Sequence, residues 1–189
     1  WSHGSEYYER DLKDAFDFIE GAPQKLPKPV ETGTNLSFSS KADKPTGYKA
    51  LVGGKVVTMR DAKNIQEVIE NGVVLIKDNR IEQVGKVGAV QIPKDALIID
   101  AKGKTIIPGL IDAHAHGSMA TNQIIPRQNW SQYSNLAFGV TTIHDPSNDT
   151  NEFFSAAEMQ RAGLIVTPRI YSTGRILYGA ESVGAKAII

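Results

Sequence analysis

His114 and His116, which are separated by one residue, have the types and spacing that point most directly to chemistry in this chain. They end a mostly apolar run, 109–116, that follows Pro108. If this run is a β-strand, side chains two residues apart share a face, so Asp112 lies on the same face as both histidines. Two imidazoles on one face can bind one metal ion, and the glycine after them lets the chain turn away. The pattern therefore predicts His114 and His116 as metal ligands at the carboxyl end of a strand.

Asp112 sits deeper on the same face, and its role has two interpretations. It orients one imidazole as a hydrogen-bond acceptor behind the metal, or it fills a polar layer inside the fold. The histidine pair also has a plain alternative, namely two polar residues that end a strand. Two histidines without further ligands bind metal weakly and with little selectivity, so that copper or nickel competes with zinc.

The composition limits the classes of partner. Lysine plus arginine and aspartate plus glutamate number 21 each among 189 residues, so no bulk charge recruits nucleic acid or an anionic membrane. There are no cysteines, which excludes disulfides and leaves histidines and carboxylates as metal ligands. No apolar run approaches the roughly 20 residues of a membrane-spanning helix. We therefore expect no nucleic-acid partner and no membrane span.

The first 107 residues divide into two segments of different character. In 1–47, apolar residues at helical spacing predict a helix over 5–20, and a Pro- and Ser-rich extended connector follows it. Residues 48–107 contain short β-rich runs with two-residue turn signals at Gly53-Gly54 and Asp78-Asn79. We interpret these runs as antiparallel strands of a small sheet or part of a β-sandwich, with a scaffold role.

The third segment, 108–189, alternates strands and helices. The expected elements are a strand over 109–116, a helix over 129–138, a strand over 139–144, a helix over 151–162 and a strand over 169–172. This alternation is typical of a parallel α/β fold, in which reactive groups collect at the carboxyl ends of the strands. His144 ends the second strand, so we expect it on the same side of the sheet as His114 and His116.

Three further residues are candidates for substrate binding, and each has a structural alternative. His144 either hydrogen-bonds a substrate carbonyl or carboxylate, or is a structural histidine held by Asp145. Arg175 and Tyr178 follow the third strand and either line the mouth of a pocket or belong to a surface loop.

The end of the chain does not fit the strand and helix pattern. Residues 184–189 are typical of a fourth strand, but only a few residues separate them from Tyr178, whereas a parallel crossover needs about a dozen. We expect residues to be missing near 181–183. Because the chain starts at Trp1 and ends in an apolar run, we also expect it to be part of a longer protein.

Several of these stretches resemble the amidohydrolase superfamily of metal-dependent hydrolases. Lys104-Thr-Ile-Ile-Pro-Gly-Leu-Ile-Asp-Ala-His-Ala-His116 resembles the first barrel strand of that superfamily, and Gly139-Val-Thr-Thr-Ile-His-Asp145 resembles the second. Residues 51–57 and 72–85 are similar to strands of its N-terminal β-sandwich. Tyr7-Tyr-Glu-Arg-Asp-Leu-Lys-Asp-Ala-Phe16 resembles the segment that precedes the amidohydrolase part in a subgroup fused to a TolB-like β-propeller.

The resemblance implies a fold and a chemistry. The fold is α/β, with the start of a (β/α)8 TIM barrel, incomplete here, and part of a small N-terminal β-sandwich. The resemblance makes His114 and His116 the first two ligands of a centre with one or two divalent ions, most often zinc, with manganese, iron or nickel as alternatives. The other ligands of the superfamily, including the last-strand Asp that acts as general base, cannot be assigned in this chain. The reaction would be hydrolysis of carbon–nitrogen bonds by metal-activated water.

The expected partner is a small amide, cyclic amide or peptide-like substrate, and this part alone is expected to be inactive. We also expect a homo-oligomer. Half of a parallel barrel exposes sheet edges and apolar surface that would need a partner, which argues against a stand-alone binding module. A β-propeller in the same parent chain would place the protein in the periplasm or outside the cell, and otherwise we expect a cytoplasmic protein. The alternatives are a non-catalytic relative that keeps the fold as a scaffold, and a binding module.

Overall fold

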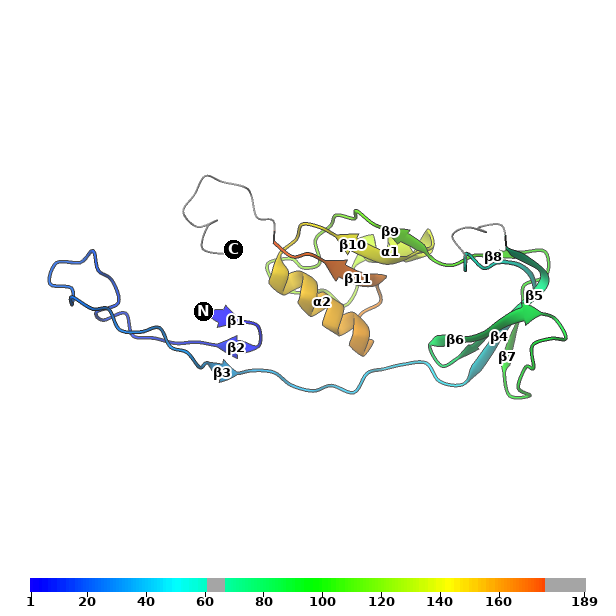
Figure 1. Cartoon of the computed structure of the whole chain (residues 1–189), viewed down its shortest axis with the longest axis horizontal. Coiled ribbons are helices and arrows are strands. Elements are labelled where there is room, and N and C mark those ends of the chain that lie inside the picture. The colour runs from blue at the N-terminus through cyan, green and yellow to red at the C-terminus, as the bar shows by residue number, and fades with distance from the viewer. Residues whose placement is uncertain (61–66, 176–189) are drawn as a thin grey trace. The chain divides into compact units, whose positions relative to one another are not determined.

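The computed structural model describes residues 1–60 and 67–175 (Figure 1). One compact unit spans Trp1–Lys41 and a second unit begins at Ala42. Each unit is described by itself. The expected strand over 184–189 and the candidate residue Tyr178 lie outside the described residues.

The N-terminal unit contains three short antiparallel strands, β1 (Ser2–His3), β2 (Glu6–Tyr7) and β3 (Thr34–Asn35). The prediction of a helix over 5–20 is therefore wrong. An isolated helix of this length is marginal unless its apolar face is buried, and Leu12 and Ile19 remain 63% and 53% exposed. Outside β3, residues 22–47 form neither helix nor strand.

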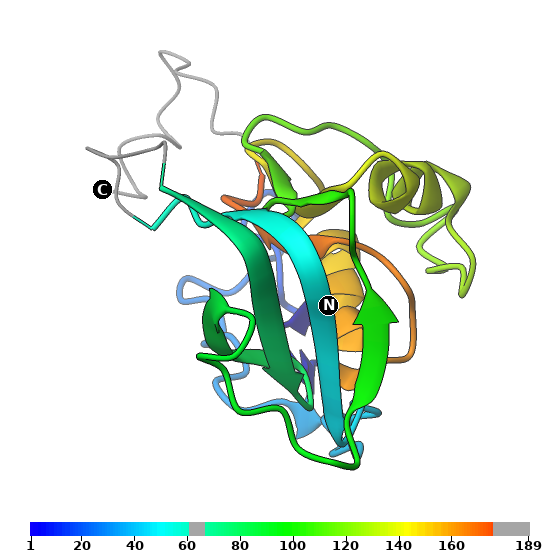
Figure 2. The same cartoon turned by 90° about the vertical axis from the view of Figure 1, so that its right-hand side faces the viewer.

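The second unit starts with a five-stranded mixed sheet. Its strands are β4 (Tyr48–Val57), β5 (Val68–Lys77), β6 (Arg80–Lys86), β7 (Leu97–Asp100) and β8 (Thr105–Ile106). The order is β6-β5-β4-β7, and β8 also pairs with β4. Figure 2 shows the long strands β4 and β5 side by side. The antiparallel pattern predicted for this segment holds for β4, β5 and β6, but β7 and β8 pair with β4 in parallel.

The two turn signals in this sheet have different outcomes. Asp78-Asn79 joins β5 to β6 as a two-residue hairpin, and Asp78 has a φ of 54°. The hairpin predicted at Gly53-Gly54 is wrong, because β4 runs through both residues with shifts of register. Gly54 instead allows β4 to lie close to the segment after β7, because a Cβ atom on Gly54 would lie 3.1 Å from the Cβ atom of Ala101.

A three-stranded parallel sheet follows, in the order β11-β10-β9. Strand β9 is Leu110–Asp112, β10 is Val140–Asp145 and β11 is Arg169–Ser172. The connecting helices are α1 (Trp130–Ala137) and α2 (Thr150–Ala162). The predicted alternation of parallel strands and helices is confirmed, although β9 ends four residues earlier than predicted. The protein is a mixed α/β fold in which sheet predominates.

Helix α2 is defined at both ends by local chemistry. The Asp149 side chain caps the first turn, and Gly163 ends the helix in the left-handed conformation with a φ of 76°. Its inner face carries Phe153, which is fully buried, and packs in a core with Ile143 of β10 and Ile170 of β11. This core fixes β10 and β11 against α2 and so positions the strand ends that carry the polar residues. No helix in the described part of the chain has the length and apolar character to cross a membrane.

Candidate functional site

The His114 and His116 rings are neighbours. Their centroids lie 5.0 Å apart with the ring planes at 68°, and both side chains are exposed. Ala115, between them, is 7% exposed and belongs to the core with Ile143 and Phe153. The segment leaves β9 through a turn at 113–114, and Ala115 points into the core while the two imidazoles lie together on the solvent side.

Three hydrogen bonds hold this segment against β10 and the loop that follows it. The carbonyl of Ala113 accepts from His144 Nδ1 at 3.2 Å, and the Ala115 N–H donates to the carbonyl of His144 at 2.9 Å. The carbonyl of Gly117 accepts from Asn148 Nδ2 at 2.8 Å. Ala113, Ala115 and Gly117 are thus hydrogen-bonded to β10 or to the loop after it. The imidazoles of the two histidines between them remain accessible to a ligand.

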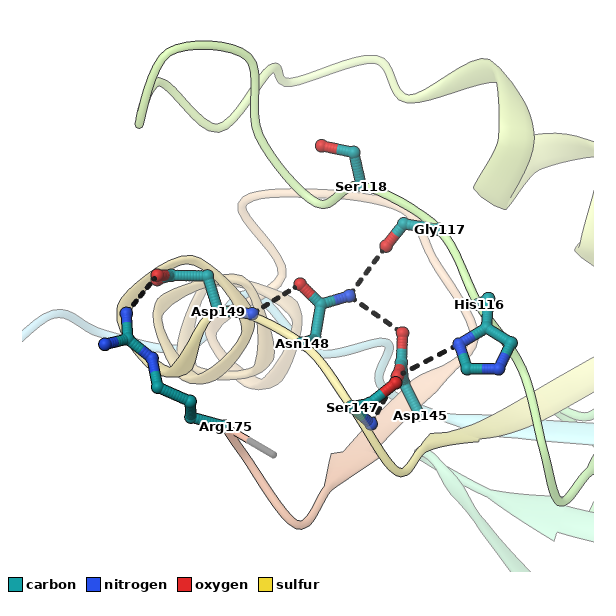
Figure 3. Close-up of a pocket in the computed structure, with 8 residues that line it drawn as sticks. All are labelled: His116, Gly117, Ser118, Asp145, Ser147, Asn148, Asp149 and Arg175. Atoms are coloured by element: carbon teal, nitrogen blue, oxygen red, sulfur yellow. Dashed lines mark hydrogen bonds and ion pairs between the residues drawn. The ribbon is translucent and has the colours of Figure 1, made fainter. Parts of the chain in front are cut away.

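Asp145, the last residue of β10, lies behind His116 with only 1% of its surface exposed. Its Oδ1 accepts the Ser147 N–H at 2.8 Å, and its Oδ2 accepts from Asn148 Nδ2 at 2.7 Å. The same Oδ1 lies 3.6 Å from His116 Nδ1 (Figure 3). The sequence suggested Asp145 only as a structural partner of His144, and its contact with His116 was missed.

The other predicted residues occupy less central positions. Asp112 Oδ1 accepts the backbone N–H of His114 at 3.1 Å, so in this structure it stabilises a turn of the chain and does not contact an imidazole. His144 is half-buried and bound to Ala113, where the sequence had suggested Asp145 as its structural partner.

An open pocket of about 780 Å³ adjoins His116. Its lining residues come from 116–118, from the end of β10 and the loop that follows it, and from the segment after β11: His116, Gly117, Ser118, Asp145, Ser147, Asn148, Asp149 and Arg175 (Figure 3). Arg175 lies at the edge of this pocket, which is one of the two positions that the sequence left open for it.

Arg175 forms an ion pair with Asp149 at the pocket edge, with 3.3 Å between Nη2 and Oδ2. The backbone N–H of Glu152 holds the pKa of the Asp149 carboxyl below its usual value. Desolvation opposes this effect, whereas the Asn151 N–H and the Arg175 guanidinium add to it. The Asp149 carboxylate is thus occupied by its hydrogen bonds to the first turn of α2 and by its ion pair with Arg175.

The described residues do not contain a complete metal site. Within 1–60 and 67–175, no three histidine or carboxylate side chains are placed to hold a metal ion together. The two neighbouring imidazoles, one of them backed by a carboxylate, nevertheless match the nitrogen donors that zinc and related divalent ions accept. A metal ion held here by both histidines would need at least one further ligand.

Known proteins with similar sequences and folds point to one superfamily. Over 128 residues the chain is 33% identical to an imidazolonepropionase of Caldanaerobacter subterraneus, covering 65% of this chain and 28% of that protein. Over 92 residues it is 34% identical to an enamidase of Eubacterium barkeri, covering 48% and 22%. A crystal structure from Bifidobacterium longum, provisionally assigned as a prolidase, matches with a TM-score of 0.58 and 27% identity over 73% of this chain and 33% of that one. No family model matches the chain.

Together with the strand motifs, these similarities support the amidohydrolase superfamily for this chain. The chain spans about a third or less of the length of each protein named above.

Proposed function

We propose that this chain is part of a metal-dependent hydrolase that cleaves carbon–nitrogen bonds in amide, cyclic amide or peptide-like substrates. The observation that carries the proposal is the pair of exposed imidazoles 5.0 Å apart at the carboxyl end of a parallel strand. In parallel α/β folds this is the edge at which reactive groups gather. The similarity to an imidazolonepropionase, an enamidase and a structure provisionally assigned as a prolidase supports this class of reaction.

We further propose that β9, β10 and β11 are the first three strands of a (β/α)8 barrel. They are parallel, and each lies beside its neighbour in sequence, which is the arrangement a barrel requires. The mixed sheet β4–β8 would form part of the β-sandwich that precedes such a barrel. The remaining ligands and the general base would then come from later strands of a longer protein.

His114 and His116 would hold the metal, most simply zinc, with manganese, iron or nickel as alternatives. A bound divalent ion supplies Lewis-acid polarisation of the substrate carbonyl and increases the acidity of water at neutral pH. Arg175 would meet an anionic or carbonyl group of the substrate at the pocket edge, where it lies beside Asp149. His144 keeps Nε2 for substrate because Nδ1 is bound to Ala113. Tyr178 remains a prediction from the sequence.

The test is metal analysis and activity of the full-length gene product. We expect one or two equivalents of divalent metal, and hydrolysis of one or more members of a panel of N-acyl amides, cyclic amides and dipeptides. His114→Gln and His116→Gln should lower both the metal content and the rate, whereas the matched control His3→Gln, in the N-terminal unit, should change neither. Full retention of metal in both site variants would overturn the assignment of the ligands. A metal-free protein without hydrolase activity would favour a non-catalytic scaffold.

A further inference from the structure

We infer that Asp145 is the residue that positions His116 for metal binding, by fixing which ring nitrogen carries the proton. The inference rests on the proposed function because it concerns one of the two proposed ligands. The sequence had suggested Asp112 as the acceptor that orients an imidazole, and we assign this role instead to Asp145 at the end of β10.

The carboxylate of Asp145 is held in place by groups other than His116. The Ser147 N–H binds Oδ1 and the Asn148 amide binds Oδ2, at 2.8 and 2.7 Å. Asn148 also donates to the carbonyl of Gly117, directly after His116 in the chain. The amide of Asn148 therefore links the backbone after His116 to the Asp145 carboxylate, and the imidazole of His116 lies beside that carboxylate (Figure 3).

This geometry favours one tautomer of His116. Asp145 Oδ1 lies 3.6 Å from Nδ1, and the carboxylate is 1% exposed, whereas the imidazole side chain is 58% exposed. A fixed, buried acceptor beside Nδ1 stabilises the form with the proton on Nδ1, because that N–H can point at the oxygen. The lone pair on Nε2 is then directed away from Asp145 and is available to a metal. Histidines that bind metals almost always donate their other N–H to a carboxylate or carbonyl in this way.

Asp112 provides a matched comparison. It is also an aspartate next to the histidine pair, but it is exposed and its Oδ1 accepts a backbone N–H from His114 at 3.1 Å. Asp112→Asn keeps an oxygen for that bond, so we expect it to leave the His116 tautomer and the metal affinity unchanged.

The first measurement needs no variant at position 145. We would record the ring ¹⁵N shifts of the full-length, metal-free protein at a pH where the imidazoles are neutral, and assign His116 by the signal that disappears in His116→Gln. We expect the proton of His116 on Nδ1. Because neutral imidazole in water favours the Nε2–H form, a His116 signal with the proton on Nε2 would overturn the inference.

The second measurement compares Asp145→Asn with Asp112→Asn. Asp145→Asn retains an acceptor for Ser147, but its new amide group faces that of Asn148 and its negative charge is lost. We expect His116 to lose its preference for the Nδ1–H tautomer, and the affinity for Zn²⁺ alone, measured by competition with a chromogenic chelator, to fall about 10- to 100-fold. A thermal unfolding curve verifies that the variant is folded, and if it is not, the wild-type tautomer decides the question.

The outcomes separate this inference from the proposed function. Unchanged Zn²⁺ affinity in folded Asp145→Asn would overturn the positioning role even if the protein is an active hydrolase. A wild-type protein that binds no metal but holds the His116 proton on Nδ1 would overturn the proposed function, and would support the orientation of His116 by Asp145.

Discussion

Replacing Asn148 with alanine tests whether the loop after β10 holds the candidate site together. The Asn148 amide donates to Asp145 Oδ2 at 2.7 Å and to the carbonyl of Gly117 at 2.8 Å, and its oxygen accepts the Asp149 N–H at 2.8 Å. A hydrogen bond to a charged group contributes about 1.5–3 kcal/mol and a neutral one about 0.5–1.5 kcal/mol. Asn148 is half-buried, so water replaces some of what is lost. We therefore expect the free energy of unfolding to fall by about 3 kcal/mol.

The assay is urea unfolding of the full-length protein, followed by far-ultraviolet circular dichroism and by tryptophan fluorescence. Agreement between the two probes would support a two-state analysis. The control is Asn151→Ala, an exposed asparagine in the first turn of α2, where alanine favours the helix and the change in stability should be close to zero or slightly positive.

A loss in the free energy of unfolding below about 1 kcal/mol for Asn148→Ala would refute this prediction, because one ordinary neutral hydrogen bond contributes that much by itself. It would mean that the bridge between Gly117 and Asp145 contributes little to the folded protein, and that the histidine segment is held by its backbone bonds to β10.

Three more changes test other parts of the structure. Gly109→Ala should lower stability by about 1–3 kcal/mol or more, because its new methyl group would overlap a threonine side chain of β10; an unchanged urea midpoint would contradict this. Phe153→Ala should cost about 3–5 kcal/mol because Phe153 is fully buried, and the half-exposed Phe154 of the same helix should give a clearly smaller loss in the same measurement. Asp149 has a lowered pKa in the folded state, chiefly through the Glu152 N–H, so its charge stabilises the fold above its ordinary pKa of 3.8, and this contribution is lost as the pH falls through the folded pKa. Asp149→Asn keeps a capping side chain and should make the urea midpoint less dependent on pH in that acidic range; an identical pH profile would contradict the assignment.

Local sequence signals predicted several elements well. Helix α2 was expected to span 151–162 and spans Thr150–Ala162, because a polar capping segment and Gly163 mark its ends. The Asp78-Asn79 hairpin and the parallel order of β9, β10 and β11 were also expected, since turn residues and the spacing of apolar runs reflect these features directly.

The errors come from contacts between residues far apart in sequence. A helix over 5–20 needs an apolar surface to pack on, which its own residues do not reveal. The parallel pairing of β7 and β8 with β4 depends on segments about 50 residues away. The candidate site shows the same difference between local and long-range features. The spacing of His114 and His116 could be seen in the sequence. The position of Asp145 beside His116 results from the pairing of β9 with β10 and could not be predicted from spacing.

The alternation of bonded and free residues from Ala113 to Gly117 has a consequence for how this sequence can change over time. Deleting or inserting one residue between Gly109 and Ala113 would exchange the two faces of the segment, turning both histidines toward β10 and the core. A substitution there alters one contact, but a change of length alters all of them. The exposed loop residues 121–124, beyond the buried Met119 and Ala120, are not subject to this restriction. This part of the loop can lengthen or shorten while the two imidazoles remain where they are.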